Sequence, residues 1–218
     1  MADNSLFLKV KLTEELFEII DELFKFANTY YESFLFELDE NIQRQERIKE
    51  EHSILFYPHL YWWAVFCAPL DNDNKTIFDQ YLHKFLPRIK RKKAVLHTIL
   101  QWRNVYPSFY LYVHSFGDRV LIVKDLIDHT FKVVSIHNKD YHMPVQNEVL
   151  TGLILPFGNG TYCTIIDFLH MPANITIEAD ASLMIFHPSI QASSYPQYLK
   201  RNYPKFLAHR LQTGVQAQ

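Results

Sequence analysis

The sequence predicts an α+β protein in which a helical region, residues 1–105, precedes a small antiparallel β-barrel-like region, residues 106–187, and a basic C-terminal tail, residues 188–218. Two hydrophobic patterns, one in each part of the chain, carry this prediction. Apolar residues recur three and four positions apart in the first half of the chain, and beyond Trp102 they alternate with a period of two. Of the 218 residues, 48% are hydrophobic, so the chain can bury a sizeable core and is not globally disordered.

The first predicted helix begins at Thr13, an N-cap residue followed by two glutamates in the first turn. Residues 39–53 are polar with alternating charge and predict a solvated helix or a helical linker. Between these positions lies one long amphipathic face. Its apolar members are Leu16, Ile19, Ile20, Leu23, Phe24, Ala27, Tyr30, Tyr31, Phe34 and Leu38.

The longest uncharged segment, residues 54–70, raises the question of a membrane span. It contains Pro58 and Pro69 and lies at or below the length that crosses a bilayer. We therefore predict a buried helix, with Trp62 and Trp63 in the core, and no membrane partner.

Two more helices are predicted before the sheet. Residues 69–74 are dense in turn formers, so a new helix should begin near Thr76. Pro87 should kink or divide it, because proline lacks the N–H that a helix interior uses. The last helical stretch, residues 88–103, turns its basic side chains toward solvent.

Five strands follow, each rich in aromatic and β-branched residues, and their short spacing favours a curled or closed sheet without exposed edges. Gly117 and Asp118 mark a hairpin turn between the first two. Residues 175–186 predict a helix capped by Asn174, and the tail from Ser193 predicts short basic helical turns. The predicted strands are residues 108–114, 119–126, 130–136, 148–155 and 162–169.

Charge is distributed unevenly along the chain. Residues 1–57 hold 13 acidic and 6 basic side chains, whereas residues 58–105 hold 3 acidic and 8 basic ones. We expect these two arms to pack together, because opposite charges on neighbouring helices attract at close range. The net charge of −2 argues against a general nucleic-acid binder.

The compartment is predicted from the cysteines and the N-terminus. Cys67 and Cys163 lie far apart in apolar runs, which is typical of reduced core thiols rather than of disulfides or zinc ligands. The first 16 residues show no basic segment followed by an apolar one, so they do not resemble a secretion signal. We expect a cytoplasmic protein.

Motifs for known chemistry are absent from the sequence. It has only five glycines, no phosphate-binding loop, no G-x-S-x-G and no H-E-x-x-H, so we predict no cofactor. The stretch with His129, His137 and His142 has no zinc-ligand spacing, and we predict no bound metal. Asp125, Asp128 and Asp167 would suit a metal-dependent nuclease if they converged, but aspartates in turns more often cap local backbone.

The strongest surface feature is a run of cations after Pro87. We interpret it as a solvated face paired with the acidic arm, and we predict a non-enzymatic interaction, adaptor or regulatory protein that binds another protein. The alternatives are a nucleic-acid-binding regulator that uses this run and, second, the nuclease. The contact candidates are Arg88, Lys90, Arg91, Lys92 and Lys93, with Arg103, Tyr110 and Tyr112.

About 55 residues of the second region resemble the β-domain found upstream of the SEC-C zinc motif in a group of bacterial proteins. The resemblance rests on Trp102 through Pro107-Ser108-Phe109-Tyr110, on residues 120–133 and on residues 150–156. It implies a structural β-domain and no catalytic residues. His129 stands where that pattern has Gly, and residues 146–148 replace its Gly-Asp. The sequence has no paired cysteines, so nothing that the zinc motif binds is carried over.

Overall fold

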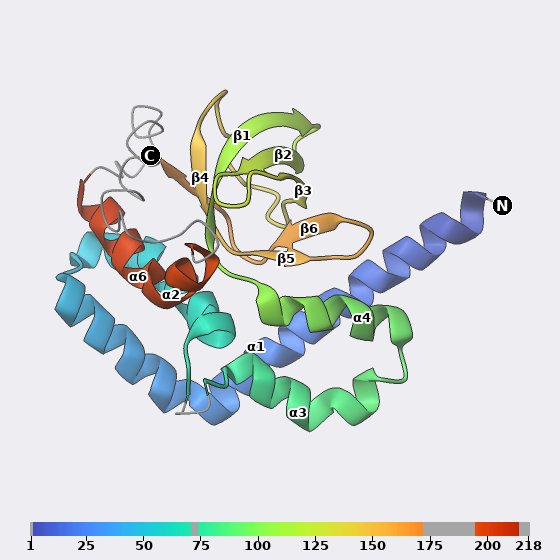
Figure 1. Ribbon diagram of the computed structural model, residues 1–218, viewed down its shortest axis with the longest axis horizontal. Coiled ribbons are helices and arrows are strands. Elements are labelled where there is room, and N and C mark those ends of the chain that lie inside the picture. The colour runs from blue at the N-terminus through green and yellow to red at the C-terminus, as the bar shows by residue number, and fades with distance from the viewer. Residues whose placement is uncertain (1, 71–73, 172–194, 214–218) are drawn as a thin grey trace.

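A curled, barrel-like sheet rests on a layer of helices in the computed structural model, which describes residues 2–70, 74–171 and 195–213 (Figure 1). All the helices of the first half precede the strands along the chain. The predicted α+β class, with a helical region followed by a barrel-like sheet, is therefore confirmed.

Helix α1 spans Ala2–Glu46 and is longer than predicted at both ends. Thr13 lies inside it, so the prediction of an N-cap there is wrong. Residues 2–12 contain neither Pro nor Gly, and nothing in them stops a helix. Tyr31 has non-helical backbone angles and kinks α1, which bends the helix beneath the sheet (Figure 1).

Helix α2, Glu50–Cys67, follows a short link at residues 47–49. The polar segment 39–53 is thus mostly helical, with Arg47 in the left-handed region at φ 53° where α1 ends. From Phe56 onward most side chains of α2 are buried, as predicted. None of the helices in the described parts of the chain combines the length and the apolar composition needed to cross a bilayer.

Helix α3, Ile77–Ile89, begins where the sequence predicts. The Thr76 hydroxyl accepts a hydrogen bond from the Asp79 N–H, and the Asp79 carboxylate accepts one from the Thr76 N–H, both over 3.2 Å. The helix ends two residues after Pro87. Helix α4, Lys93–Gln101, then starts in a new direction and runs into the short 3₁₀ helix η1, Trp102–Asn104. The predicted stretch 88–103 is therefore divided, and residues 90–92 form a corner.

The sheet has seven described strands in the order β5-β6-β3-β2-β1-β4-β7. All neighbours are antiparallel except β3 and β6, which pair in parallel, so the sheet is mixed rather than wholly antiparallel as predicted. The strands are β1 (Ser108–Phe116), β2 (Val120–Asp125), β3 (Phe131–Ser135), β4 (Val149–Gly152), β5 (Ile154–Pro156), β6 (Thr161–Thr164) and β7 (Leu169–Met171).

Two predicted strands each form two. Residues 148–155 divide at Leu153, so that β4 pairs with β1 and β7 while β5 pairs with β6. Gly152 ends β4 where the Phe168 ring comes close, because a Cβ there would lie 3.0 Å from that ring. Residues 162–169 divide into the end of β6 and the start of β7, and the irregular segment 165–168 connects them.

The largest apolar cluster of the core joins the helices to the sheet. The Trp102 indole lies between them, fully buried, and donates its N–H to the Pro156 carbonyl over 2.8 Å. Helix α6, Tyr195–Thr213, packs on α2, and the Trp63 N–H donates to the Lys200 carbonyl over 2.8 Å. The tail thus contains one long helix with a buried face instead of short basic turns. The helix predicted over residues 175–186 lies outside the described residues.

Candidate functional site

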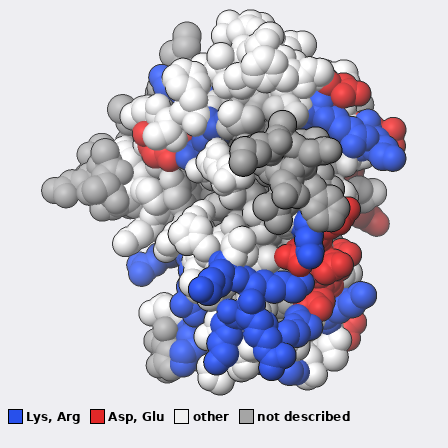
Figure 2. All heavy atoms as spheres, turned by 90° about the vertical axis from the view of Figure 1, so that its right-hand side faces the viewer, with Lys and Arg blue, Asp and Glu red and all other residues white. Residues whose placement is uncertain are grey.

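Residues 88–93, named here the basic corner, connect α3 to α4 at the edge of the helical layer. Figure 2 shows Lys and Arg side chains gathered over this part of the molecule, with acidic side chains beside them. The corner forms because α3 ends soon after Pro87 and α4 starts at Lys93, so the cations do not follow one helix face.

Two of the five cations of the basic corner are neutralised by the acidic arm, as the charge pattern predicts. The Arg88 guanidinium donates to the Glu22 carboxylate of α1. The Lys92 ammonium lies 3.0 Å from a Glu15 oxygen on the same helix. Burial raises the pKa of Glu22, but hydrogen bonds from Arg88 and Tyr81 outweigh it, and the pKa lies below its ordinary value. These pairs fasten both ends of the corner to α1.

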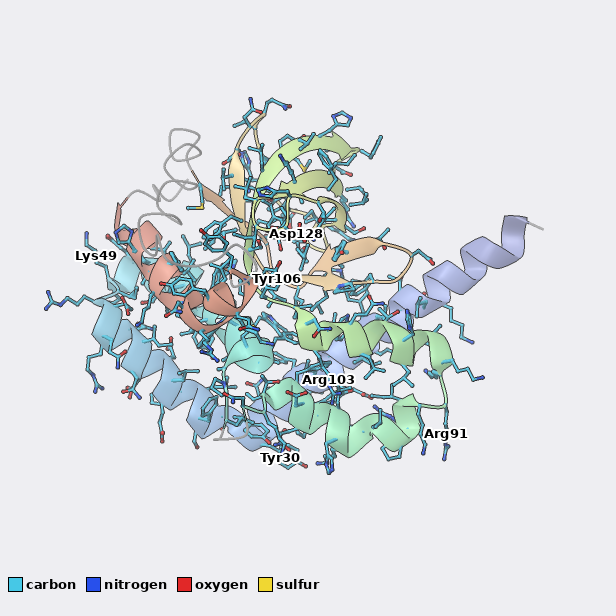
Figure 3. All side chains as sticks on the ribbon, in the orientation of Figure 1. Tyr30, Lys49, Arg91, Arg103, Tyr106 and Asp128 are labelled. Carbon is cyan, nitrogen blue, oxygen red and sulfur yellow. The ribbon has the colours of Figure 1, made fainter. Side chains whose placement is uncertain are left out.

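The other three cations of the corner are free for an outside partner. Lys90, Arg91 and Lys93 are exposed, and none makes an ion pair with another residue in the described parts of the chain. Figure 3 shows Arg91 projecting from the α3–α4 connection. The structure therefore presents three uncompensated cations at one place.

Apolar and aromatic side chains are also exposed along α3 and the adjoining part of α1, with Tyr30 at the opposite end of α3 from Arg91 (Figure 3). Leu86 is exposed on α3, and Tyr30 of α1 is 59% exposed. The Lys84 ammonium lies 4.0 Å from the centre of the Tyr30 ring, a cation–π contact that holds the ring at the surface. The Arg88 guanidinium lies 5.2 Å from the centre of the Phe85 ring. Aromatic and cationic side chains thus adjoin each other on this face.

Three predicted contact residues lie elsewhere. Arg103 is in η1, at the other end of α4 from Arg91, and pairs with Asp79 over 3.1 Å (Figure 3). Tyr110 and Tyr112 point into a core cluster beneath the sheet and are 1% and 9% exposed. The expectation that they form part of an exposed contact surface is wrong, because both lie on the inward face of β1.

Asp125 and Asp128 do come together, and Lys132 joins them. The Lys132 ammonium lies 2.7 Å from an Asp128 oxygen and 3.6 Å from an Asp125 oxygen. Asp125 also accepts hydrogen bonds from the Ser108 hydroxyl and the Ile127 N–H. Asp128 accepts from the N–H and hydroxyl of Thr130. Every oxygen of the two carboxylates therefore has a partner already, which is the arrangement of a structural clamp.

The charges of this clamp follow from its burial. Burial raises the pKa of Asp125 above its ordinary value. Burial acts on Asp128 in the same direction, but hydrogen bonds from Lys132 and Thr130 outweigh it and lower its pKa. For Lys132, burial is outweighed by the hydrogen bond to Asp128 and by the charge of Asp125, so its pKa is raised. The sequence signal for Lys132 is its inward position in the alternation of β3.

Asp167 does not join this cluster. It lies between β6 and β7 and accepts a hydrogen bond from the Asn138 amide over 2.6 Å. In the parts of the chain that the structure describes, no three His, Cys, Asp or Glu side chains are arranged to hold a metal ion. The described aspartates thus cap backbone and bind neighbouring side chains, as turn aspartates commonly do.

A cavity of about 260 Å³ opens beside the clamp, where the chain passes from η1 into the sheet. Tyr106, Tyr110 and Tyr162 line it together with the two clamped aspartates and Lys132. Tyr106 and Asp128 are labelled in Figure 3. The charged groups of the clamp are held by one another and by neighbouring residues, and the cavity lies at the joint between helices and sheet.

Comparison with known proteins assigns the chain to no family. No protein-family model matches the chain, and no curated protein matches its sequence. The resemblance to the β-domain upstream of the SEC-C motif therefore stays a prediction.

Proposed function

We propose that this protein is a non-enzymatic interaction module that binds an acidic segment of another protein at its basic corner. One observation carries the proposal: Lys90, Arg91 and Lys93 are exposed together without acidic partners among the described residues, while their neighbours Arg88 and Lys92 are held by α1. The fixed pairs keep the corner in place, and the free cations are available to an acidic chain.

The surroundings of the corner support a protein partner. Tyr and Arg dominate the binding energy of protein interfaces, and exposed Tyr30 and Leu86 lie on the helices that form this face. A partner segment with a few carboxylates and an apolar side chain would find complementary groups here. Localised cations beside aromatic rings favour such a compact segment.

The neighbouring acidic arm disfavours a long polyanion. Glu15 and Glu22 of α1 adjoin the corner, and the protein as a whole carries a net charge of −2. A nucleic-acid backbone that crossed the corner would continue over α1, whose acidic side chains outnumber its basic ones, and would be repelled there. A short acidic peptide segment avoids them.

We place this activity in the cytoplasm. Cys67 and Cys163 are both free and buried, and such thiols persist most readily where the surroundings are reducing. An adaptor that binds another protein there needs no bound cofactor or metal.

Photo-crosslinking in living cells tests the proposal. A photoreactive phenylalanine analogue replaces Lys90, and covalent products are separated and identified by mass spectrometry. We expect a discrete protein adduct whose cross-linked peptide is rich in Asp and Glu, and we expect Arg91→Gln with Lys93→Gln to abolish it, because the attraction would be lost.

The matched control places the same photoreactive residue at Lys139, which is exposed in a loop of the sheet region. A charge-matched variant, Lys139→Gln with Lys205→Gln, removes two exposed cations elsewhere and should leave the adduct at position 90 intact. A product that nuclease digests would favour the nucleic-acid alternative, and equal products from positions 90 and 139 would refute a specific corner.

A further inference from the structure

A second cavity, of about 170 Å³, lies where the first half of α1 passes the end of β3 and the start of β6. Part of its lining is aromatic. The centre of the Phe17 ring of α1 lies 4.5 Å from that of the His137 ring and 5.0 Å from that of the Phe157 ring. The chain that enters β2 contributes Arg119 to the same lining. The cavity thus combines aromatic surface with a cationic side chain.

Arg119 directs its side chain toward the inward face of the sheet. It directly precedes β2, in which Leu121 and Val123 are buried and their neighbours are less so. Because side chains alternate between the two faces of a strand, Arg119 continues the series of the buried residues. The Ile136 N–H donates to the Arg119 carbonyl over 2.8 Å, and Ile136 is buried on the same face and also lines the cavity. The ladder between β2 and β3 therefore fixes where the guanidinium leaves the backbone.

The guanidinium of Arg119 has no partner in the described parts of the chain. Arg119 is only partly exposed, and its side chain makes no hydrogen bond or ion pair there. Asp118, Glu14 and Glu18 adjoin the lining along the chain, but all three are exposed, and none of the described lining residues is acidic. Arginine does not lose its proton in proteins, and an unpaired charge that is partly withdrawn from water opposes folding. The lining therefore favours an anion.

We propose that this cavity binds a small organic anion with one planar ring and one carboxylate group. The carboxylate pairs with the Arg119 guanidinium, whose parallel N–H groups match its two oxygens. The ring packs against Phe17 and Phe157. The site is distinct from the basic corner and does not depend on its function.

The size of the cavity limits the ligand to one ring. An apolar cavity of about 150 Å³ holds one benzene molecule, so about 170 Å³ accommodates a single six-membered ring. The turn between β5 and β6 keeps the cavity small. Gly158 has φ 86°, and a Cβ there would lie 3.3 Å from the Leu12 side chain of α1. Thr161 lines the cavity after this turn, and its N–H and hydroxyl both donate to the Gly158 carbonyl, over 2.9 and 2.8 Å. A larger ring system would have to part this turn from the helix.

Benzoate and benzamide provide a matched pair of probes, because they have nearly the same shape and only benzoate is charged. Binding of each to the full chain is measured by isothermal titration calorimetry or ligand-observed NMR at constant ionic strength. We expect saturable binding of benzoate with one site per chain. Benzamide should bind roughly tenfold more weakly, since hydrogen bonds between charged groups are the stronger ones. Acetate has the carboxylate without the ring and should also bind roughly tenfold more weakly than benzoate.

Two variants separate the cation from the aromatic wall. Arg119→Gln should weaken benzoate binding roughly tenfold and leave benzamide binding nearly unchanged, because it removes the charge and keeps a polar side chain. It should fold normally, since the guanidinium has no described partner to lose. Phe17→Leu should weaken the binding of both probes alike, because it removes ring surface and no charge. Arg201→Gln is the control, because Arg201 is exposed on α6 and lies outside the cavity.

A loss of affinity in Arg119→Gln that is confined to benzoate supports the proposal. The proposal is overturned if benzoate shows no saturable binding, if acetate binds as tightly as benzoate, or if Arg119→Gln binds benzoate as Arg201→Gln does.

Discussion

Asp125 is a carboxylate that the fold has taken almost completely out of water, at 2% exposure. It joins three elements, because it accepts hydrogen bonds from β1 and from the turn after β2 and lies against Lys132 of β3. Asp125→Asn keeps the size of the side chain and removes its charge. We expect it to lower the free energy of unfolding by about 2–3 kcal/mol, since a buried ammonium then loses part of its compensation.

Urea unfolding measures this loss. Asp118→Asn is the control, because Asp118 is exposed in the β1–β2 turn and surface changes of this kind stay within about 0.5 kcal/mol. If Asp125→Asn lowered the free energy of unfolding as little as Asp118→Asn does, the clamp would contribute little to the joint between the strands.

His59 should make stability depend on pH. Its pKa falls from 6.5 to about 3 on burial, so the unfolded chain binds a proton there between these values while the folded chain does not. The contribution of His59 to stability is therefore complete above about pH 6.5 and is lost progressively as the pH falls toward 3. Between about pH 7.5 and about pH 5 the loss should be about 2 kcal/mol.

Urea unfolding at several pH values gives the free energy of unfolding of His59→Leu and of the native chain. The difference between their pH dependences isolates the effect of His59. The variant should lose about 2 kcal/mol less over the same interval. His83→Gln, which removes an exposed histidine, should retain the native dependence. Identical pH profiles for all three proteins would show that His59 titrates alike in the folded and unfolded chains.

Sequence reasoning found the residues whose role depends on their immediate neighbours. The basic corner was visible because its cations are contiguous, and Thr76 because an N-cap is a local pattern. It missed Lys132, His59 and Arg119. Their burial depends on contacts with segments distant in the chain, and no local pattern records whether such a polar group keeps a partner.

At the scale of elements, the capping box at Thr76 should make a measurable contribution to the free energy of unfolding. Thr76→Ala removes the acceptor for the Asp79 N–H at the start of α3. We expect a loss of about 1 kcal/mol in the free energy of unfolding, the usual cost of an N-cap. Thr76→Ser keeps a hydroxyl and should restore most of it. Thermal unfolding followed by circular dichroism distinguishes the two, and equal losses would assign the effect to packing of the Thr76 methyl group.

The boundaries of elements were predictable where a residue imposes them. Thr76 starts α3, and Pro87 precedes its end by two residues. The division of residues 148–155 was not predictable, because Gly152 serves a contact with Phe168 from a later segment. Helix α6 was missed for a similar reason. Its two prolines obscured the helical pattern, while the face that holds it is set by α2.

At the scale of the whole molecule, the shared core predicts one cooperative unfolding unit. The largest apolar cluster contains Trp102 and Phe56 from the helical region as well as Leu155 and Cys163 from the sheet. Cutting the chain at the change of pattern near Val105 would leave both parts with an exposed apolar face. We expect the helices and the sheet to unfold together.

Chemical labelling of the two cysteines tests whether the helices and the sheet unfold together. Burial raises the pKa values of Cys67, in α2, and of Cys163, in β6, to about 12, so each thiol should react only when its surroundings open. Labelling with an alkylating reagent at increasing urea, followed by mass spectrometry of each peptide, should give the same midpoint for both. Earlier labelling of Cys163 would show instead that the sheet opens while the helices remain folded.

The arrangement of the strands has a consequence for self-association. Within the described sheet, the outermost strands β5 and β7 contain three residues each, whereas the nine-residue β1 lies between two partners. Pro156 ends β5 and has no N–H to offer. Exposed strand edges are the template on which ordered aggregates grow. A sheet with its longest strand enclosed and its described edges this short gives a second copy little backbone to pair with, so we expect the protein to stay monodisperse at concentrations where a flat open sheet would precipitate.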